Sequence, residues 1–343
     1  MPDPRAACAA LFLAVPMFLG TNSESLAQTS APITKPLDGP ELEGPILRPG
    51  ANSEADTTEP KSDRPADLAF GAYQRGYYLT ALQLALPRAE TGDPAAQTLI
   101  AELYWNGQGV ARDREKAAEW YRFAADAGNS QAQFAYANIL LQGKYAPLDK
   151  AEGQAFMEKA AQAGHVRAQF NLAQLITNNR PTWAGFKQAL PWYQKAAEAG
   201  LADAQYALAN IHAEAKGVNF NDDELAREWL EKAAVGGFDT AQVQLGIWAA
   251  NGRGGEKDEK AALIWFARAA AKNNVIAQNR LARMYAFGVG TSVDRIKAGA
   301  WHIVARRAGF NDAEMDRQFS ALPKIDQTRA IELANRLSRR AGS

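Results

Sequence analysis

Apolar residues recur along the chain at helical spacing, in short stretches that glycines interrupt. In the first complete example, Ile100, Leu103 and Tyr104 fall on one face of a predicted helix. Gly107 and Gly109 follow at once, and glycine tolerates the positive φ that a tight reversal of the chain requires. The pattern therefore predicts a helix that ends in a tight turn.

A second apolar stripe completes a helical hairpin. Asp113 stands just before this stripe, where its carboxylate can accept a backbone N–H at the start of a helix. Ala117, Trp120 and Ala124 share one face, and Gly128 is placed to end the helix in the left-handed conformation. The small alanines let two helix backbones approach closely, and we expect the tryptophan to fill the space beside them.

The hairpin recurs at a nearly constant interval. Its opening Ala-Gln pair is found at residues 96, 132, 168, 204, 241 and 277, so the intervals are 36, 36, 36, 37 and 36 residues. Such a period is typical of stacked repeats, because one hairpin cannot bury its apolar stripe alone. We expect the large aromatic residue of each unit to be a wedge in the core, although an exposed aromatic ladder is the alternative. These residues are Trp120, Phe156, Trp192, Trp229, Trp265 and Trp301.

The frame resembles the Sel1-like repeat family, a relative of the tetratricopeptide repeat. The resemblance rests on the order alanine, Leu-Ala or Leu-Gly, tyrosine, Gly-x-Gly-Val, aspartate, Lys-Ala, Trp-Tyr, Ala-Ala and glycine, over about residues 96 to 310. It implies an all-α fold, a right-handed α/α solenoid, and a role as a protein-binding scaffold.

The segments outside the frame differ in character. Residues 1–27 contain Arg5, an apolar run over 6–20 and small residues at 25–27, which predicts a signal peptide cleaved after Ala27. A cytosolic protein with an apolar start is the alternative. Residues 28–66 hold seven prolines and no apolar period, which predicts a disordered tether. We expect a degenerate first repeat over 67–94, six repeats over 95–310 and capping helices over 311–343.

Charge, cysteine content and hydropathy argue against nucleic-acid binding, disulfides and a membrane-spanning segment after signal cleavage. The chain of 343 residues has 38 lysines and arginines against 38 aspartates and glutamates, so no basic stripe predicts nucleic-acid binding. The single cysteine, Cys8, lies in the predicted signal peptide, so the mature chain would lack the disulfides of secreted members of the family. No second apolar run is long enough for a membrane span after signal cleavage. The predicted signal peptide indicates a periplasmic or secreted protein, and the resemblance implies the bacterial type of the family.

The sequence contains no catalytic motif and predicts no cofactor or metal site. His165, His212 and His302 fall in different units without the spacing of a metal-binding helix. No Gly-x-Ser-x-Gly motif occurs, and the Gly-x-Gly pairs lie between helices, never after a strand. We therefore expect no enzymatic activity. The resemblance leaves a β-lactamase-like hydrolase as a remote alternative, because some secreted relatives have been linked to β-lactam binding or hydrolysis.

One candidate binding surface is a row on the first helices of three central units. The resemblance implies that first helices line the concave face, where aromatic rings could stack on a peptide and amides could bond its backbone. The alternative is that the aromatics pack against the next unit. The row comprises Phe134 and Asn138, Phe170 and Gln174, and Tyr206 and Asn210.

A second candidate surface is formed by three loops that lack the paired glycines. They lie around residues 144–147, 178–183 and 218–221, and each carries an aromatic residue that we expect to be exposed: Tyr145, Trp183 and Phe220. Exposed aromatics suit a protein partner. Sequence drift in tolerant loops is the alternative.

These features together predict a non-enzymatic adaptor of the bacterial envelope that binds a protein. Family analogy implies one form of this role, in which the adaptor binds the sensor domain of a membrane histidine kinase and restrains exopolysaccharide or envelope-stress output. A scaffold for envelope or peptidoglycan assembly is the alternative.

Fusion of residues 1–30 to alkaline phosphatase tests the predicted export. We expect phosphatase activity, because this enzyme forms its disulfides only in an oxidising compartment. A fusion without residues 1–27 is the control. Full-length but inactive fusion protein would contradict export.

Overall fold

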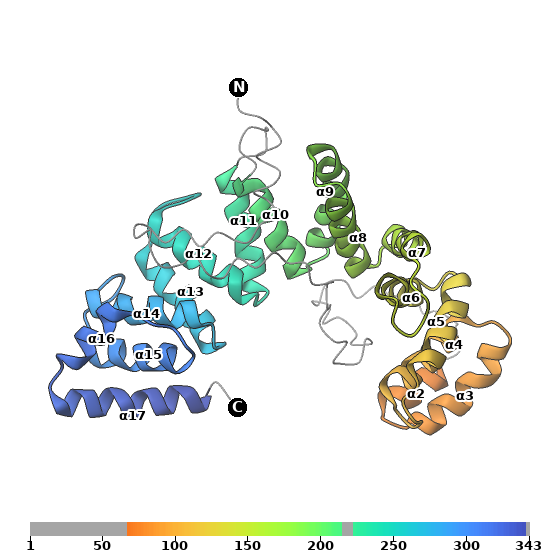
Figure 1. The fold of residues 1–343 in the computed structure, drawn as a ribbon, viewed down its shortest axis with the longest axis horizontal. Helices are drawn as coiled ribbons and strands as arrows, with labels where there is room; N and C mark the ends of the chain where they lie inside the picture. Colours follow the sequence, from red (N-terminus) through yellow and green to blue (C-terminus); the bar gives the residue numbers. More distant parts are fainter. Residues whose placement is uncertain (1–66, 215–221, 341–343) are drawn as a thin grey trace, which may run out of the picture. The chain divides into compact units, whose positions relative to one another are not determined.

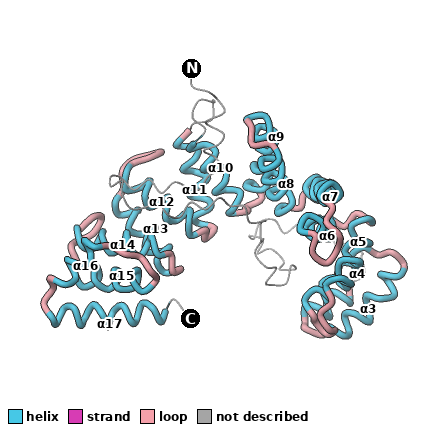
Figure 2. Tube along the Cα trace, in the orientation of Figure 1, coloured by secondary structure: helices cyan, strands magenta, loops and turns pink. Residues whose placement is uncertain are grey.

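The computed structural model describes residues 67–214 and 222–340, and in these ranges all regular structure is helical. Sixteen helices and no strand are present in this part of the chain (Figures 1 and 2). The prediction of an all-α helical repeat fold is confirmed.

The described residues divide into two compact units between Asn179 and Arg180. The N-terminal unit holds α2 (Leu68–Gln74), α3 (Tyr78–Glu90), α4 (Pro94–Asn106), α5 (Arg114–Asp126), α6 (Ser130–Gln142), α7 (Lys150–Gln162) and α8 (Val166–Asn179). The C-terminal unit holds α9 (Trp183–Glu198), α10 (Ala202–Glu214), α11 (Asp223–Val235), α12 (Asp239–Asn251), α13 (Glu259–Ala271), α14 (Val275–Phe287), α15 (Arg295–Arg307), α16 (Ala313–Ser320) and α17 (Lys324–Arg340). The even-numbered helices α4 to α14 are the first helices of the six repeats, and the odd-numbered helices α5 to α15 are the second.

Aspartates begin most of the second helices, as the sequence predicts. Asp113 Oδ1 accepts a hydrogen bond from the backbone N–H of Lys116 at 2.9 Å. The backbone N–H of Asp113 donates to the carbonyl of Tyr104 at 3.0 Å, which closes the loop between α4 and α5. Gly128 ends α5 with a φ of 90°, which confirms the expected left-handed stop. Equivalent caps are formed by Asp149, Asp222, Asp258 and Asp294.

The glutamine that opens each repeat ties it to the hairpin before it. Its side chain is buried, and Nε2 donates to a backbone carbonyl eight residues earlier, in the last turn of the preceding helix. The same carbonyl accepts the N–H of the left-handed residue that ends that helix, as Ala125 does from Gly128 at 3.0 Å. The bonds are Gln97 to Ala89 (3.1 Å), Gln133 to Ala125 (3.2 Å), Gln169 to Ala161 (3.2 Å), Gln205 to Ala197 (3.1 Å), Gln242 to Ala234 (2.9 Å) and Gln278 to Ala270 (3.4 Å).

Small residues bring the paired helices close together. Ala117 on α5 and Ala262 on α13 are completely buried. Gly246 on α12 shows how little space is left, because a Cβ atom there would lie 2.9 Å from the ring of Phe266. Each hairpin is therefore a thin layer that needs its neighbours to bury its apolar surface.

The recurring tryptophans pack against the core but do not form its deepest layer. Trp229 and Trp265 both lie against a cluster built from α10, α11 and α12, in keeping with the predicted wedge. Each remains partly exposed, and a cation three residues later covers its ring; Lys232 Nζ lies 3.8 Å from the Trp229 ring centroid. The residue after the aromatic is buried more deeply, as Tyr121 shows with 1% exposure.

Replacing Gln133 with methionine tests the bond between hairpins. We expect the free energy of unfolding to fall by about 1 kcal/mol, because the side chain keeps its volume but loses a buried donor. Urea unfolding followed by circular dichroism measures the change. Gln162→Met is the control, since Gln162 is exposed on α7. Equal effects of the two substitutions would show that the buried bond contributes nothing.

Candidate partner-binding surfaces

Phe134 and Asn138, the first pair of the predicted row, make contacts within the N-terminal unit. Phe134 on α6 is only 7% exposed, and its ring stacks on His165 with centroids 4.5 Å apart. His165 begins the next repeat, where its Nδ1 accepts the backbone N–H of Ala168 at 3.1 Å. The amide of Asn138 donates to the Phe134 carbonyl at 2.8 Å, so it also bonds within its own helix.

The protonation state of His165 suits this capping role. Burial lowers the pKa of His165 to about 4, and the nearby charge of Arg167 acts in the same direction. The ring is therefore neutral at pH 7, and Nδ1 can serve as the acceptor of the helix cap. The proton then resides on Nε2, which lies 2.9 Å from Oε1 of Gln131.

The other two pairs lie on different units. Phe170 and Gln174 are half-buried on α8 of the N-terminal unit. In the C-terminal unit, the ring of Tyr206 lies 5.0 Å from that of Phe238, at the start of the next repeat. Asn210 Oδ1 accepts from Nε2 of Gln244 at 3.2 Å. Phe134 and Tyr206 thus pack against following repeats, as the alternative expected, and a partner-binding role for the row stays a prediction.

In the last repeat, the same two positions of the row hold another segment of the chain. Asn279 and Arg283 on α14 correspond to Phe134 and Asn138 on α6. The amide of Asn279 and the guanidinium of Arg283 both donate to Oδ2 of Asp312, each at 2.9 Å. Arg283 also donates to Oε2 of Glu314 at 2.7 Å. The first-helix face of this repeat therefore binds an acidic segment at the start of α16.

The three predicted loop aromatics have different outcomes. Tyr145 was expected to be exposed, and this is wrong, because its ring lies half-buried and edge-on to Trp105 with centroids 5.5 Å apart. Its backbone has a φ of 69°, a left-handed conformation that costs a non-glycine residue about 1–2 kcal/mol. Trp183 is the first residue of α9, and its side chain lies outside the described residues, as does Phe220.

Glu102 is a buried carboxyl group that sequence reasoning did not single out as a site. It occupies the position of Asn138 in the first repeat and is completely buried, with no hydrogen bond to Oε1. The buried hydroxyl group of Tyr73 also has no hydrogen-bond partner among the described residues. Burial raises the pKa of Glu102 to about 7, although the neighbouring Tyr121 and Asn106 side chains lower it. No signal in the sequence marked this residue, because its spacing places it on a helix face without showing what packs against that face.

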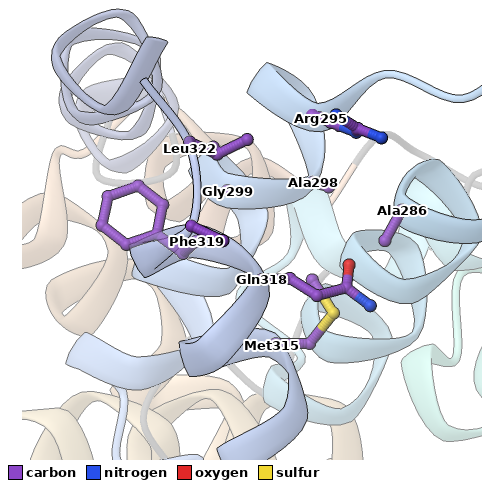
Figure 3. Close-up of a pocket in the computed structure, with 9 residues that line it drawn as sticks. Ala286, Arg295, Ala298, Gly299, Met315, Gln318, Phe319 and Leu322 are labelled. Carbon is purple, nitrogen blue, oxygen red and sulfur yellow. The ribbon is translucent and has the colours of Figure 1, made fainter. Parts of the chain in front are cut away.

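A cavity of about 340 Å³ lies in the C-terminal unit, between α14, α15 and α16 (Figure 3). Met315, Phe319 and Leu322 give it an apolar wall, and Arg295 and Gln318 add polar groups. None of the predicted site residues that the structure describes lines it.

Two further observations concern membranes and metals. In the described ranges, no helix combines the length and the apolar character needed to cross a membrane. The same residues contain no group of three or more histidine, cysteine, aspartate or glutamate side chains that could hold a metal ion.

Glu102→Gln tests the buried carboxyl group. Because the folded state favours the protonated form, the stability that Glu102 contributes is complete below pH 4.5 and is lost as the pH rises through about 7. We expect the variant to be more stable than the natural chain by roughly 1–3 kcal/mol at pH 8 and nearly equal at pH 4.5. Urea midpoints at both pH values measure the difference. A variant that is less stable at pH 8 would contradict the assignment.

Comparison with known proteins identifies the repeats. A family model described as Sel1 repeat matches residues 94–129, 130–165, 184–201, 202–237, 240–274 and 275–310, which is more than half of the chain. The third match is short, because it covers α9 and omits α8. A search of curated proteins gave no match.

Solved structures agree with this result. A Sel1 repeat protein from Oxalobacter formigenes is 28% identical, with a TM-score of 0.60 over 72% of this chain and 100% of that one. The protective antigen c5321 of uropathogenic Escherichia coli, which displays the same fold, is 25% identical with a TM-score of 0.50. That match covers 77% of this chain but 65% of the antigen. Sel1 repeat proteins are generally non-catalytic scaffolds for protein interactions. The chain belongs to the Sel1 repeat family.

Proposed function

We propose that this protein is an exported, non-enzymatic adaptor of the bacterial envelope that holds a segment of a protein partner on its first-helix faces. The finer role follows from family analogy: the partner is the sensor domain of a membrane kinase, and binding restrains envelope or exopolysaccharide output. The export step rests on the apolar start of the sequence and its small residues before Gln28.

The binding of Asp312 and Glu314 by the last repeat carries the proposal. There, two side chains one helical turn apart on α14 hold a chain segment through three hydrogen bonds of 2.7–2.9 Å. These bonds are charge-assisted, and such bonds are stronger than neutral ones. The face therefore has the geometry to bind a polar segment.

The same helical positions are polar and partly accessible in the N-terminal unit. Asn138 on α6 and Gln174 on α8 are both half-buried, and amides can donate and accept hydrogen bonds with a peptide backbone. Phe134 is less suitable as a direct contact, because 7% exposure leaves little of its surface for a partner. Its ring packs on His165 and so helps to hold the proposed binding face in place.

The structural neighbours are compatible with a role in the envelope. The antigen c5321 is a protective antigen of uropathogenic strains, and this chain shares its repeat fold. An alternative in the same compartment is a scaffold for envelope or peptidoglycan assembly. The identity of the captured partner separates the two roles.

Crosslinked pull-down from an envelope fraction tests the proposal. The natural protein is expected to enrich a membrane sensor kinase, whereas cell-wall enzymes in its place would favour the assembly role. Asn138→Lys with Gln174→Lys should reduce capture by about tenfold, because two lysines replace neutral amides on the proposed face. Alanine at Phe134 is less informative, since loss of a buried ring destabilises the fold.

The matched control is Gln142→Lys with Gln162→Lys, which adds the same charge at exposed positions of α6 and α7. Equal capture by both variants would place the contact elsewhere. Failure of the natural protein to enrich any envelope protein, or turnover of a chromogenic β-lactam, would contradict the adaptor role itself.

A further inference from the structure

The turn between α6 and α7 differs from the equivalent turns of repeats one, five and six. In those turns a glycine has a φ of 72°, 66° and 66°, at Gly109, Gly254 and Gly290. Each glycine lies against the first residue of an earlier helix, and a Cβ atom on Gly109 would come within 2.8 Å of Tyr78. Repeat two places Tyr145 in the same left-handed conformation, with a φ of 69°. A bulky side chain in this position is unfavourable, so a compensating contact is expected.

Tyr145 makes that contact with Arg114, the first residue of α5. Arg114 Nη1 donates to the Tyr145 hydroxyl group at 2.6 Å. The guanidinium carbon lies 5.1 Å from the ring centroid of Trp105 and 5.3 Å from that of Tyr145. Lys144 adds a second cation, with Nζ 5.2 Å from the Tyr145 ring. Two cations and two aromatic rings thus meet at one loop of the N-terminal unit.

No carboxylate balances these two cations in the described part of the chain. Arg114 and Lys144 form none of the ion pairs found there, and Nε of Arg114 is buried without a hydrogen bond. The phenol responds to the excess positive charge. Its hydrogen bond with Arg114, and secondarily the one with Lys144, lower the pKa of Tyr145, although burial acts in the opposite direction.

The C-terminal unit shows what the same loop does with balanced charges. Arg253 stands between two glycines at the position of Lys144, and Asp223 begins α11 as Arg114 begins α5. The Arg253 guanidinium donates to Oδ1 of Asp223 at 2.8 and 3.0 Å and stacks on Trp248, 4.3 Å from its ring centroid. Against the loop of repeat two, Arg114 of repeat one takes the place of this acid, so among the described residues an otherwise similar cation and aromatic arrangement contains no carboxylate.

We propose that Arg114 and Lys144, supported by the rings of Trp105 and Tyr145, bind a carboxylate of an acidic segment in the protein partner. This inference rests on the proposed adaptor function and specifies the partner's chemistry. Arginine can present two parallel N–H donors to a carboxylate, and stacking on the rings holds its plane in position. The partner would supply the acid that Asp223 supplies within the C-terminal unit.

Fluorescence anisotropy with the full chain tests the site. The probe is a fluorescein-labelled octapeptide in which glutamate and leucine alternate, and a peptide with glutamine in place of glutamate is its control. We expect the acidic peptide to bind at least tenfold more tightly than the glutamine peptide, and its affinity to fall as salt is added. Arg114→Gln with Lys144→Gln should weaken binding of the acidic peptide by about tenfold.

A second pair of substitutions separates site-specific binding from general attraction. Arg122→Gln with Lys159→Gln removes the same charge from exposed positions of the same unit, and binding should stay within twofold of the natural chain. Tyr145→Gly retains the turn, since glycine occupies it in three other repeats, and should weaken binding by about fivefold. Circular dichroism confirms that each variant is folded.

Several results would overturn the inference. These are no binding of the acidic peptide by the natural chain, equal binding of both peptides, or equal losses in the two double variants. The pull-down distinguishes a failure of this site from a failure of the proposed adaptor function. If Arg114→Gln with Lys144→Gln leaves capture of an envelope partner unchanged, this site is wrong and the adaptor role stands.

Discussion

A buried hydrogen bond between successive hairpins fixes the arrangement of each unit. The glutamine at the start of a repeat donates to the last turn of the helix before it, at a carbonyl that also accepts the N–H of a left-handed residue. Carbonyls at the end of a helix lack the partner that the next turn would supply. The glutamine is therefore a second donor to a carbonyl at the helix end, beside the N–H of the left-handed residue, and its bond links one hairpin to the next.

Alanine and glycine make this arrangement compact. With little side-chain volume between the helices, a hairpin such as α12 and α13 is a thin layer whose stability depends on adjacent layers. A function is therefore easiest to assign at positions where the residues of one repeat differ from those of the other repeats. Two departures are related, since Arg283 holds an acidic segment of its own chain, whereas Arg114 pairs with no acid among the residues that the structure describes.

Local chemistry made most of the fold predictable. The cap of Asp113 and the left-handed stop of Gly128 depend on residues within a few positions, so the sequence is sufficient to place them. The role of the glutamines was not predicted, although the Ala-Gln pair marked every repeat. Its partner lies in another helix, and no local rule links a glutamine to a carbonyl eight residues earlier.

The candidate sites were less predictable because they depend on contacts distant in sequence. Tyr145 was expected to be exposed, but its partner Arg114 lies 31 residues away in the preceding repeat. Glu102 looked like a polar position of the first helix, yet the surrounding repeats bury it completely. Spacing alone places a residue on a helix face, whereas its burial depends on what packs against that face.

Hydrogen exchange of the glutamine side-chain amides, followed by nuclear magnetic resonance, tests the central claim most directly. If buried bonds join the hairpins, the amides of Gln97, Gln133, Gln169, Gln205, Gln242 and Gln278 should exchange much more slowly than those of the exposed Gln142 and Gln162. Equal, fast exchange of all of these side chains would show that the hairpins are not held together in this way.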